Sequence, residues 1–430
     1  MRSRRRRAAA LAVWCCALAT SLAACGDDGG DTPVVEVFGN IVGEPGRELA
    51  KVLHDASAGS GVEIRYVGVT SFNQQLEDRL ERGERPGIAL IPQPGRLANL
   101  HARGLLAPLD DSLVAELEDR IPSQLLDMVT LEGRPVAVPL TIDVKGLVWY
   151  RPSVFAEQGL EVPATLDAFE SMLEAERTNG DGVAATCADL EAGASTGWVG
   201  TDWVESLVLR RLGPERYDEW VAGTLRFDSE EIRAVFDEMD SLLRAPGAVA
   251  GGAASVSVPW QAAAAQLLAD PPACLTVHQG DFLRREFPGG TSVGPDGTVD
   301  FFPMPSVDGG AAPMLVGGLL ATPLTDDPGV AAAMEVLAGG RMATGLVRTG
   351  EYLSPSSTVD WNSVADPVAR RLVDLVAATP VVRFDGSDMM PTSIGTGTFW
   401  SGMTAFFAGE AVPAVLAEIE SGRPAEPAVT

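Results

Sequence analysis

The feature that most constrains the fold is a regular alternation of strand-like and helix-like segments over the first hundred residues. Three segments have the patterns of β-strands, at 34–39, 62–69 and 87–92. Segments with helical spacing follow each of them, at 44–58, 72–83 and 97–104, and Ser71 is placed to cap the second helix. Short links between such units predict a parallel sheet with right-handed crossovers, and therefore an α/β fold.

The rest of the chain is mostly helical, with short strands between the helices. Helical spacing recurs at 165–177, 203–213, 214–223 and 229–244, and strand patterns lie at 145–150, 273–278, 299–305 and 316–324. After the last strand we expect helices to the end of the chain. The segment GAVAGGAASVS at 247–257 has the composition of a mobile loop. About 400 residues exceed one compact core, so two domains are expected.

The N-terminus has the pattern of a secretory signal. A basic segment is followed by an apolar run from about Ala8 to Leu18, which is too short to span a membrane. The next residues, Leu22-Ala23-Ala24-Cys25, resemble a bacterial lipobox. We therefore expect residues 1–24 to be a signal peptide, Cys25 to carry a lipid and residues 25–32 to form a tether. The alternative is a plain secreted protein with a stray cysteine.

The charge of the chain excludes several classes of partner. The net charge is −27, and removal of five arginines with the signal leaves 27 basic against 59 acidic residues, or −32. Such a surface argues against nucleic acid and anionic lipid, and it disfavours polyanionic substrates. No later segment has about 18 consecutive apolar residues, so membrane contact is expected through the lipid anchor alone.

The cysteines suggest one disulfide. Of the five cysteines, Cys15 and Cys16 leave with the signal and Cys25 is predicted to be lipidated. Cys187 and Cys274 remain in an oxidising compartment, where a disulfide between them is expected. The alternative is a pair of buried free thiols far apart.

No motif predicts a catalytic, metal or cofactor site. GASTG at 193–197 fits the G-x-S-x-G pattern of a nucleophile elbow, but hydrolases of that order need a late histidine. The last of the three histidines, His278, is far from the C-terminus. There is no Cys-x-x-Cys pair, and neither lysine, Lys51 or Lys145, follows a glycine as in a phosphate-binding loop.

A different group of residues fits the binding of a neutral polyhydroxylated ligand. Three tryptophans and three acids lie within two residues of Gly, Ser or Pro, at the expected edges of elements: Trp198, Trp260, Trp400, Glu191, Asp202 and Asp388. Aromatic faces cover the C–H face of a sugar ring, and carboxylates accept hydrogen bonds from its hydroxyls. Each residue alone is more often a packing tryptophan or a surface acid.

Trp400 allows two interpretations. Gly395 and Gly397 precede it and permit an unusual backbone path, and the following residues have the spacing of a helix that starts near Phe399. Trp400 would then lie in the first turn, where its ring can project into a cleft. A core position is the alternative, although the apolar stripe of the helix is better supplied by Phe399, Met403, Phe406 and Phe407.

Several long blocks resemble a known family. The blocks lie at 143–152 (DVKGLVWYRP), 190–223 (from LEAGASTGW to EWVAG), 270–282 (DPPACLTVHQGDF), 301–305 (FFPMP) and 383–403 (RFDGSDMMPTSIGTGTFWSGM). In this order they resemble the solute-binding lipoproteins of bacterial ABC importers. Within these, the chain is most similar to the oligosaccharide-binding family and its α-glucoside binders.

The resemblance implies a two-lobed α/β fold of the periplasmic-binding-protein type (type II), with the ligand in a cleft between the lobes. By position, the N-terminal lobe would hold residues 33–142 and 303–362, and the C-terminal lobe residues 143–302 and 363–430. Cys187 and Cys274 match positions that look paired in relatives. The implied ligand-binding residues are Asn40, Gln93, Asp143, Glu191, Trp198, Gln279, Gly318 and Trp400, and to these we add Asp388 from the group above.

Three departures from the family pattern fall at expected cleft positions. Leu319 stands where relatives usually carry an acid, Gly280-Asp281 replaces a pair of small residues, and FGNIVGEPG at 38–46 lacks the usual aromatics. Because these residues lie at expected cleft positions, the departures bear on the identity of the ligand and less on the fold.

The resemblance implies a monomeric binding protein on the extracellular face of the cell membrane. It would capture a carbohydrate and pass it to the transmembrane permease of an ABC importer, without nucleic acid, metal or cofactor. Two alternatives remain at this point. One is a sensor or adhesion lipoprotein with the same fold, and the other is a secreted hydrolase.

Overall fold

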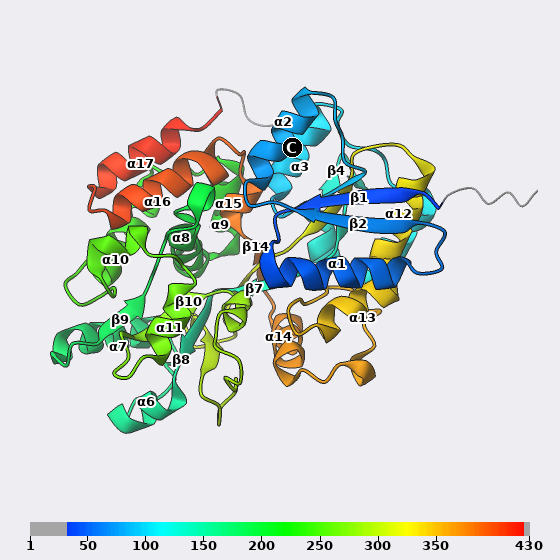
Figure 1. The fold of residues 1–430 in the computed structure, drawn as a ribbon. Coiled ribbons are helices and arrows are strands. Elements are labelled where there is room, and N and C mark those ends of the chain that lie inside the picture. The colour runs from blue at the N-terminus through cyan, green and yellow to red at the C-terminus, as the bar shows by residue number, and fades with distance from the viewer. Residues whose placement is uncertain (1–31, 425–430) are drawn as a thin grey trace, which may run out of the picture. The chain divides into compact units, whose positions relative to one another are not determined.

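The computed structural model describes residues 32–424, and Figure 1 shows its strands in separate sheets. The signal peptide, Cys25 and nearly all of the tether therefore lie outside the described residues. The first sheet has the order β2-β1-β3-β13-β6. Its strands are β1 (Val34–Gly39), β2 (Glu63–Gly68), β3 (Ile88–Ile91), β6 (Val138–Pro139) and β13 (Leu320–Pro323). As predicted, β1 pairs in parallel with both β2 and β3.

The helices between these strands also match the prediction. They are α1 (Gly43–Ser57), α2 (Phe72–Glu81) and α3 (Pro94–Ala102). Helix α1 packs against the first sheet because Leu49 and Leu53 recur on one face and are fully buried. Ser71 precedes α2 as expected, but its side chain makes no capping hydrogen bond. The segment up to the second sheet adds α4 (Asp111–Arg120), α5 (Ser123–Asp127) and the hairpin β4 (Thr130–Leu131) and β5 (Arg134–Pro135).

The second sheet has the order β11-β8-β10-β9. Its strands are β8 (Leu147–Tyr150), β9 (Ala184–Cys187), β10 (Cys274–Gln279) and β11 (Asp300–Pro303). Strands β9 and β10 are parallel neighbours, and the disulfide Cys187–Cys274 joins them, as predicted. The helices of this half are α6 (Pro152–Gln158), α7 (Leu166–Asn179), α8 (Trp198–Arg211), α9 (Gly213–Ala222), α10 (Glu230–Leu243) and α11 (Ala262–Leu268), with short 3-10 turns at Gly193–Ser195 (η1), Gly252–Ser257 (η2) and Asp281–Arg285 (η3).

A third sheet has the order β14-β12-β7, and its first two strands in the sequence, β7 and β12, lie where the chain passes between the other two sheets. It contains β7 (Asp143–Lys145), β12 (Met314–Gly317) and β14 (Val382–Phe384). Two predictions were wrong here. The single strand expected at 316–324 is two strands in different sheets, because the chain bends at Gly318, and the strand β14 interrupts the expected run of helices. Gly318 has φ +154°, and a Cβ there would lie 2.1 Å from the carbonyl oxygen of Thr141, so only glycine fits this bend.

The C-terminal helices follow these strands. They are α12 (Pro328–Ala338), α13 (Gly340–Arg348), α14 (Pro367–Ala378), α15 (Gly386–Met389), α16 (Trp400–Phe407) and α17 (Val412–Ser421), with a 3-10 turn η4 (Trp361–Ser363) and a π-helical segment η5 (Ile394–Phe399). Among residues 32–424, no single helix is long and apolar enough to cross a membrane. The pair α12 and α13, bent by 57°, passes that test by length and composition only.

The core consists of one apolar cluster that extends from the first sheet into the second, another among α7–α10, α16 and α17, and a small one around Phe38. The segment at 247–257 is not the loop that its composition predicted. Ser255 is fully buried in η2, and the amides of Ala185 and Thr186 donate to the carbonyls of Gly247 and Ala248. These hydrogen bonds hold the segment against β9.

Candidate functional site

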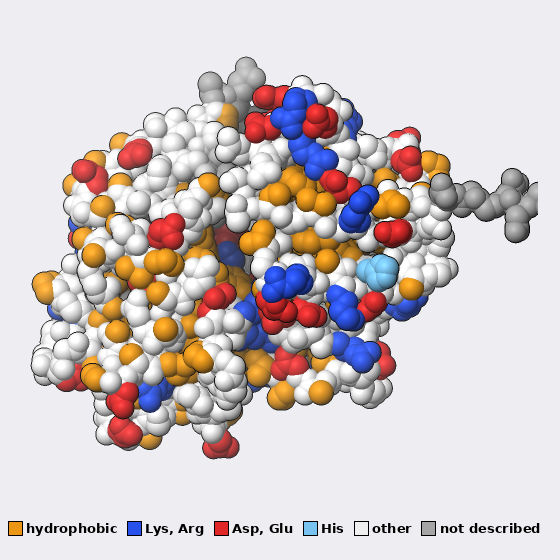
Figure 2. All heavy atoms as spheres, in the orientation of Figure 1, with side chains coloured by type: hydrophobic (Ala, Val, Ile, Leu, Met, Phe, Trp, Pro, Cys, Tyr) orange, Lys and Arg blue, Asp and Glu red, His pale blue; other side chains and the backbone are white. Residues whose placement is uncertain are grey.

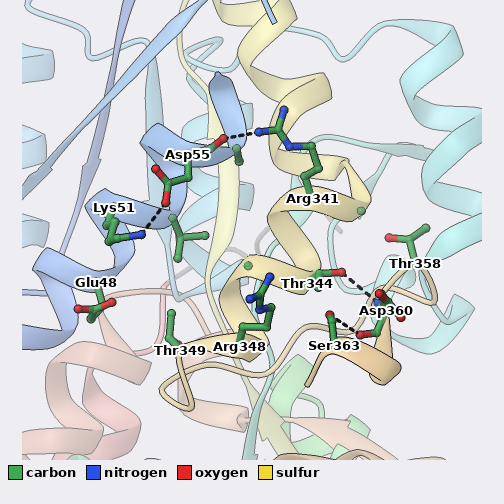
Figure 3. A pocket seen from close by; sticks show the side chains of 14 residues that line it. Glu48, Lys51, Asp55, Arg341, Thr344, Arg348, Thr349, Thr358, Asp360 and Ser363 are labelled. Carbon is green, nitrogen blue, oxygen red and sulfur yellow. Dashed lines mark hydrogen bonds and ion pairs between the residues drawn. The ribbon is translucent and has the colours of Figure 1, made fainter. Parts of the chain in front are cut away.

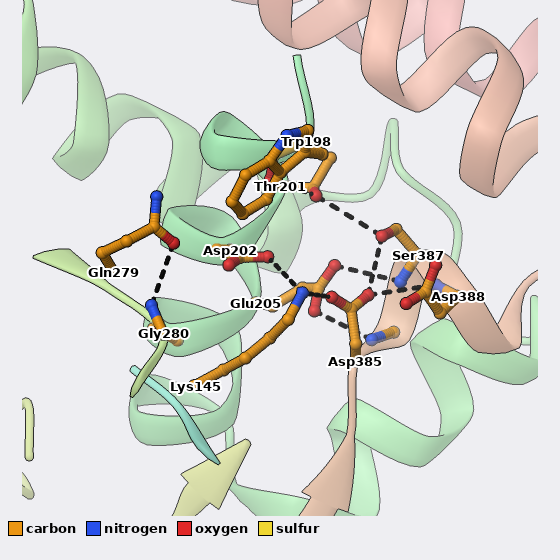
Figure 4. A network of polar contacts seen from close by, with 12 residues as sticks. Lys145, Trp198, Thr201, Asp202, Glu205, Gln279, Gly280, Asp385, Ser387 and Asp388 are labelled. Carbon is orange, nitrogen blue, oxygen red and sulfur yellow. Dashed lines mark hydrogen bonds and ion pairs between the residues drawn. The ribbon is translucent and has the colours of Figure 1, made fainter. Parts of the chain in front are cut away.

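The predicted residues of the second half gather around a buried lysine. Lys145 ends β7, and its ammonium group lies 3.0 Å from Asp202 Oδ1 on α8 and pairs with Asp385, which follows β14 (Figure 4). The side chain of Lys145 is 10% exposed and both acids are 2% exposed. Figure 2 shows a hollow in the surface over the region of β7 and β14. The crossing strands therefore bring this cluster to the middle of the molecule.

The acids of this cluster also hold the start of α15. Glu205 lies one turn after Asp202 on α8, and its two oxygens accept the amides of Gly386 (2.8 Å) and Ser387 (3.0 Å). Asp385 is the N-cap of α15 and accepts the amide of Asp388 at 3.0 Å. Carboxylates are favoured at a helix N-terminus because the first amides have no partner within the helix. This arrangement fixes Asp388 beside the cluster.

Asp202, Glu205 and Asp385 have carboxylate oxygens within 4.8 Å of one another, which is a geometry that can hold a metal ion. The ammonium group of Lys145 already contacts two of these acids, so it supplies the positive charge that a cation would supply. Glu205 is bound to backbone amides as described above. The cluster is therefore accounted for as an ion-pair network.

Burial sets the protonation of the cluster. It raises the pKa of Asp202 to about 7, and it raises the pKa of Glu205 and of Asp388 well above the usual range, with help from the charge of Asp385. Burial also opposes the charge on Asp385 and Lys145. Their mutual attraction outweighs it, so the pKa of Asp385 is lowered and that of Lys145 is raised. Lys145 and Asp385 are therefore the ionised pair at neutral pH.

Three half-buried aromatic rings form a wall beside this cluster. Trp198 begins α8, and its ring centroid lies 5.5 Å from that of Trp260 and 5.7 Å from that of Phe282, both edge-on. Lys145 Nζ lies 5.5 Å from the Trp198 centroid. Phe282 was missed by the sequence analysis, which considered only the Gly-Asp pair before it. A Cβ on Gly280 would lie 2.3 Å from the Phe282 ring, so glycine is what lets this ring approach.

Gln279 and Glu191 lie close to this wall. Gln279 ends β10, is 2% exposed and accepts the amide of Gly280 through its side-chain oxygen at 2.9 Å. Glu191 is half-buried, and its Oε1 accepts the amide of Gly193 at 2.8 Å. The backbone of Glu191 pairs with residues next to Trp260. Four of the nine predicted residues, Trp198, Gln279, Glu191 and Asp388, thus lie around the Lys145 cluster or its aromatic wall.

Two predicted residues come from the first half. Gln93 precedes α3, is 7% exposed, and lies beside Asp388 of the second half, whose pKa it lowers against the larger effect of burial. Asn40 follows β1. Among the described residues 32–424, Gln93 Oε1 and Asn40 Oδ1 are buried and have no hydrogen-bond partner. Buried polar atoms are nearly always paired, so these oxygens are suited to a molecule that is not part of the chain.

Asp143 and Gly318 lie at the crossings between the halves. Asp143 pairs with Arg285 at 3.6 Å, and Arg285 is also 3.6 Å from Glu351 and stacks on Tyr352. Gly318 makes the bend described above and has no side chain to offer.

Trp400 lies in the first turn of a helix, as predicted, and its role as a ligand platform stays a prediction. It is the first residue of α16 and follows the π-helical segment, in which Gly397 has non-helical dihedral angles (φ −108°, ψ −105°). The predicted apolar stripe of Phe399, Met403, Phe406 and Phe407 is buried. Trp400 is 8% exposed, yet it belongs to none of the three apolar clusters of the described residues, and its Nε1 has no partner.

The departures from the family pattern have structural roles. Asp281 is 1% exposed and its Oδ1 accepts the amide of Val144 at 2.8 Å, which ties η3 to β7. Leu319 is 5% exposed and belongs to the core. In place of an aromatic after β1, Tyr66 on β2 bonds the amide and carbonyl of Ile41 through its hydroxyl group.

The hydrolase pattern does not assemble a triad in residues 32–424. Ser195 lies in η1, whereas His278 is buried against Trp203 and the hydroxyl of Ser206 at 3.1 Å. Burial lowers the pKa of His278 to about 3, so it is neutral and faces the core.

A separate groove of about 750 Å³ lies between α1, α13 and η4 (Figure 3). Its rim carries both charges, with Lys51 bound to Asp55 at 2.6 Å and Arg341 donating to the carbonyl of Asp55, also at 2.6 Å. Figure 2 shows this mixed charge on the face over α1 and α13. None of the nine predicted residues lines this groove.

Comparison with known proteins supports the resemblance. A family model described as bacterial extracellular solute-binding protein matches residues 44–338. The osmoprotective compounds-binding protein GgtB of Synechocystis is 34% identical over 397 residues, covering 92% of this chain and 93% of the relative. The alpha-glucosides-binding periplasmic protein AglE of Rhizobium meliloti is 33% identical over 395 residues, covering 89% and 85%.

Solved structures agree on the fold. The bacterial solute receptor AcbH, described as preferring b-D-galactopyranose, matches with a TM-score of 0.75 at 18% identity, over 91% of this chain and 98% of that one. A chitin oligosaccharide binding protein matches with a TM-score of 0.74 at 18% identity and the same coverage. The predicted two-lobed α/β fold of the periplasmic-binding-protein type is thereby confirmed. The chain belongs to the family of bacterial extracellular solute-binding proteins.

Proposed function

We propose that this protein captures a carbohydrate, an α-glucoside or a related oligosaccharide, and delivers it to the permease of an ABC importer. The observation that carries the proposal is the set of buried, unpartnered polar atoms at Asn40, Gln93 and Trp400, on residues that the sequence predicted to bind ligand. A sugar supplies hydroxyl groups for such atoms and a C–H face for an aromatic ring. The names of the two relatives, which bind alpha-glucosides and osmoprotective compounds, agree with this ligand class.

The proposed ligand site lies between two lobes. We assign residues 33–142 and 303–362 to one lobe and 143–302 and 363–430 to the other. The first sheet falls in the first lobe and the second sheet in the second. Strand β7 begins at the first boundary, and β12 of the first lobe pairs with β7 and β14 of the second, so this third sheet connects the two lobes and is the part about which they would close on ligand.

The proposed location is the extracellular face of the membrane, where Cys25 carries the lipid and the body is a monomer without catalytic activity. The ionisable groups at the site support binding without catalysis. His278 faces the core, and the acids of the Lys145 cluster are bound to the ammonium group or to backbone amides.

A thermal-shift screen of the mature protein against mono- and disaccharides tests the ligand class. A ligand at 100 times its dissociation constant stabilises the folded state by about 2.7 kcal/mol, which is a readily measured shift. A screen in which no sugar shifts a cooperative transition refutes carbohydrate capture. Uptake of the bound sugar by cells with and without the neighbouring permease genes then separates import from sensing.

A further inference from the structure

The charges around the proposed ligand site are unusually well compensated. Lys145 contacts both Asp202 and Asp385, with Glu205 and Asp388 next to them. Arg285, on the other side, lies 3.6 Å from Asp143 and 3.6 Å from Glu351. Each of these cations therefore faces at least two carboxyl groups, and Arg285 Nε, which has no hydrogen-bond partner in residues 32–424, faces Glu351 Oε2 at 3.6 Å.

Two further buried arginines near the site are also occupied. Arg210, which comes close to Gly146, donates to the carbonyls of Ser206, Met304, Pro305 and Pro313. Arg96, on α3 after Gln93, donates to Asn73 and lies 3.3 Å from Glu77. Neither guanidinium group is directed at the residues of the site.

The unpartnered atoms of the site point to the same kind of ligand. Three are oxygens that accept hydrogen bonds, namely Asn40 Oδ1, Gln93 Oε1 and Asp202 Oδ2. Trp400 Nε1 is an unpartnered donor. Asp202 lies one helical turn from Trp198 on α8, so its free oxygen lies below the aromatic wall (Figure 4). The ligand must therefore supply mainly donors, such as hydroxyl or ammonium groups.

We propose that the site selects its ligand by charge, accepting neutral or positively charged glycosides and rejecting phosphorylated or carboxylated ones. This inference rests on the proposed carbohydrate function and adds the substrate class. An anionic group supplies acceptors only, so where it replaces a hydroxyl group it leaves an oxygen of the site unpaired, and it lies close to carboxylates that no free cation offsets. An ammonium group donates to the same oxygens and is attracted by the excess of acids.

Matched ligands test the proposal on the wild-type mature protein. Titration calorimetry at pH 8 compares trehalose, sucrose and maltose, each with its 6-amino-6-deoxy, 6-phosphate and 6-carboxylate derivatives. For a neutral sugar that binds, we expect the anionic derivatives to bind at least about tenfold more weakly, or about 1.4 kcal/mol, and the amino derivative to bind as tightly or more tightly. An anionic derivative within about threefold of its neutral parent overturns the proposal. If neither the neutral sugars nor any of their charged derivatives bind, the proposed carbohydrate function is refuted, and this inference is refuted with it.

Two variants connect the selectivity to the cluster. Asp202→Asn keeps the size of the side chain and removes one acid, so the ratio of neutral to anionic affinity should fall. Asp388→Asn is the second variant: it leaves the contacts of Lys145 with Asp202 and Asp385 intact, and because burial raises the pKa of Asp388 well above its usual range it removes no charge, so the ratio should stay that of the wild type. Glu157→Gln on α6 is the control for a change of net charge, since Glu157 is exposed and lies outside the site. An unchanged ratio in Asp202→Asn, or a ratio that falls equally in both aspartate variants, refutes the assignment to the charge of this cluster.

Discussion

Replacement of Trp400 by alanine tests whether this residue is a platform for the ligand or a residue of the core. A tryptophan side chain that packs on all sides buries about 150–250 Å², which corresponds to about 4–6 kcal/mol at about 25 cal/mol per Å². Trp400 is buried but lies outside the three apolar clusters. If one face of the ring is reserved for ligand, about half of that area packs on the protein, so we expect Trp400→Ala to lower the free energy of unfolding without ligand by about 2–3 kcal/mol, at or below the lower end of the range of about 3–5 kcal/mol for core tryptophans.

The same change should weaken ligand binding. Stacking of a flat ligand on an aromatic ring contributes about 1–3 kcal/mol, so the dissociation constant of the bound sugar should rise by about 5- to 150-fold. Trp400→Phe keeps a ring and should recover most of this loss. Urea denaturation without ligand and titration calorimetry with ligand measure the two effects on the same protein preparations.

Phe399 is the matched control because it is the adjacent residue and is fully buried against Trp220 and Phe227. Phe399→Ala should cost about 3–5 kcal/mol of folding stability and leave the affinity of the folded protein unchanged. If Trp400→Ala loses as much stability as Phe399→Ala while its affinity equals that of the wild type, Trp400 is a core residue and the platform argument is refuted.

Three further predictions concern the anchor and the second half. Cys25→Ala should abolish lipidation, and a variant that is still processed and held at the membrane contradicts the lipobox. The Cys187–Cys274 disulfide closes a loop of 87 residues, so its loss should lower the free energy of unfolding by about 4–5 kcal/mol. Urea denaturation of the variant with both cysteines changed to serine measures this loss, and a midpoint equal to that of the wild type contradicts the prediction. Burial raises the pKa of Asp189 to about 7, so the folded state keeps a proton that the unfolded state loses above about pH 4. The stability that this group contributes therefore falls as the pH rises from about 4 to about 7. Asp189→Asn lacks this titration, so its melting temperature should exceed that of the wild type by an amount that grows between about pH 4 and 7 and then stays constant. A difference that does not change with pH refutes the raised pKa of Asp189.

The fold could be predicted where local pattern and tertiary structure agree. The first three strands and their helices are such a case, because periods of two and about 3.6 residues are visible in short segments. The segment at 316–324 was misjudged because apolar residues continue through the bend at Gly318. Its pair of glycines was the available signal for a break between two strands. The segment at 247–257 was misjudged because composition does not show the hydrogen bonds that β9 supplies.

The site was predicted only in part, for a different reason. Trp198 and Trp400 were chosen as candidates because small residues beside them marked the edges of elements, and their role in binding stays a prediction. Lys145 was missed because its partners Asp202 and Asp385 are 57 and 240 residues away, a distance that no local pattern bridges. Asp281 was taken for a possible change in specificity, whereas it binds a backbone amide 137 residues away.

The most direct test of the account is a crystal structure of the mature protein with the sugar that gives the largest thermal shift. We predict the sugar between Asn40 and Gln93 of the first half and Trp198, Asp388 and Trp400 of the second. Its hydroxyl groups should donate to the oxygens that have no partner in the chain. A sugar bound instead in the groove between α1 and α13, with the Lys145 cluster and Trp400 unchanged and without contact to it, would contradict the account.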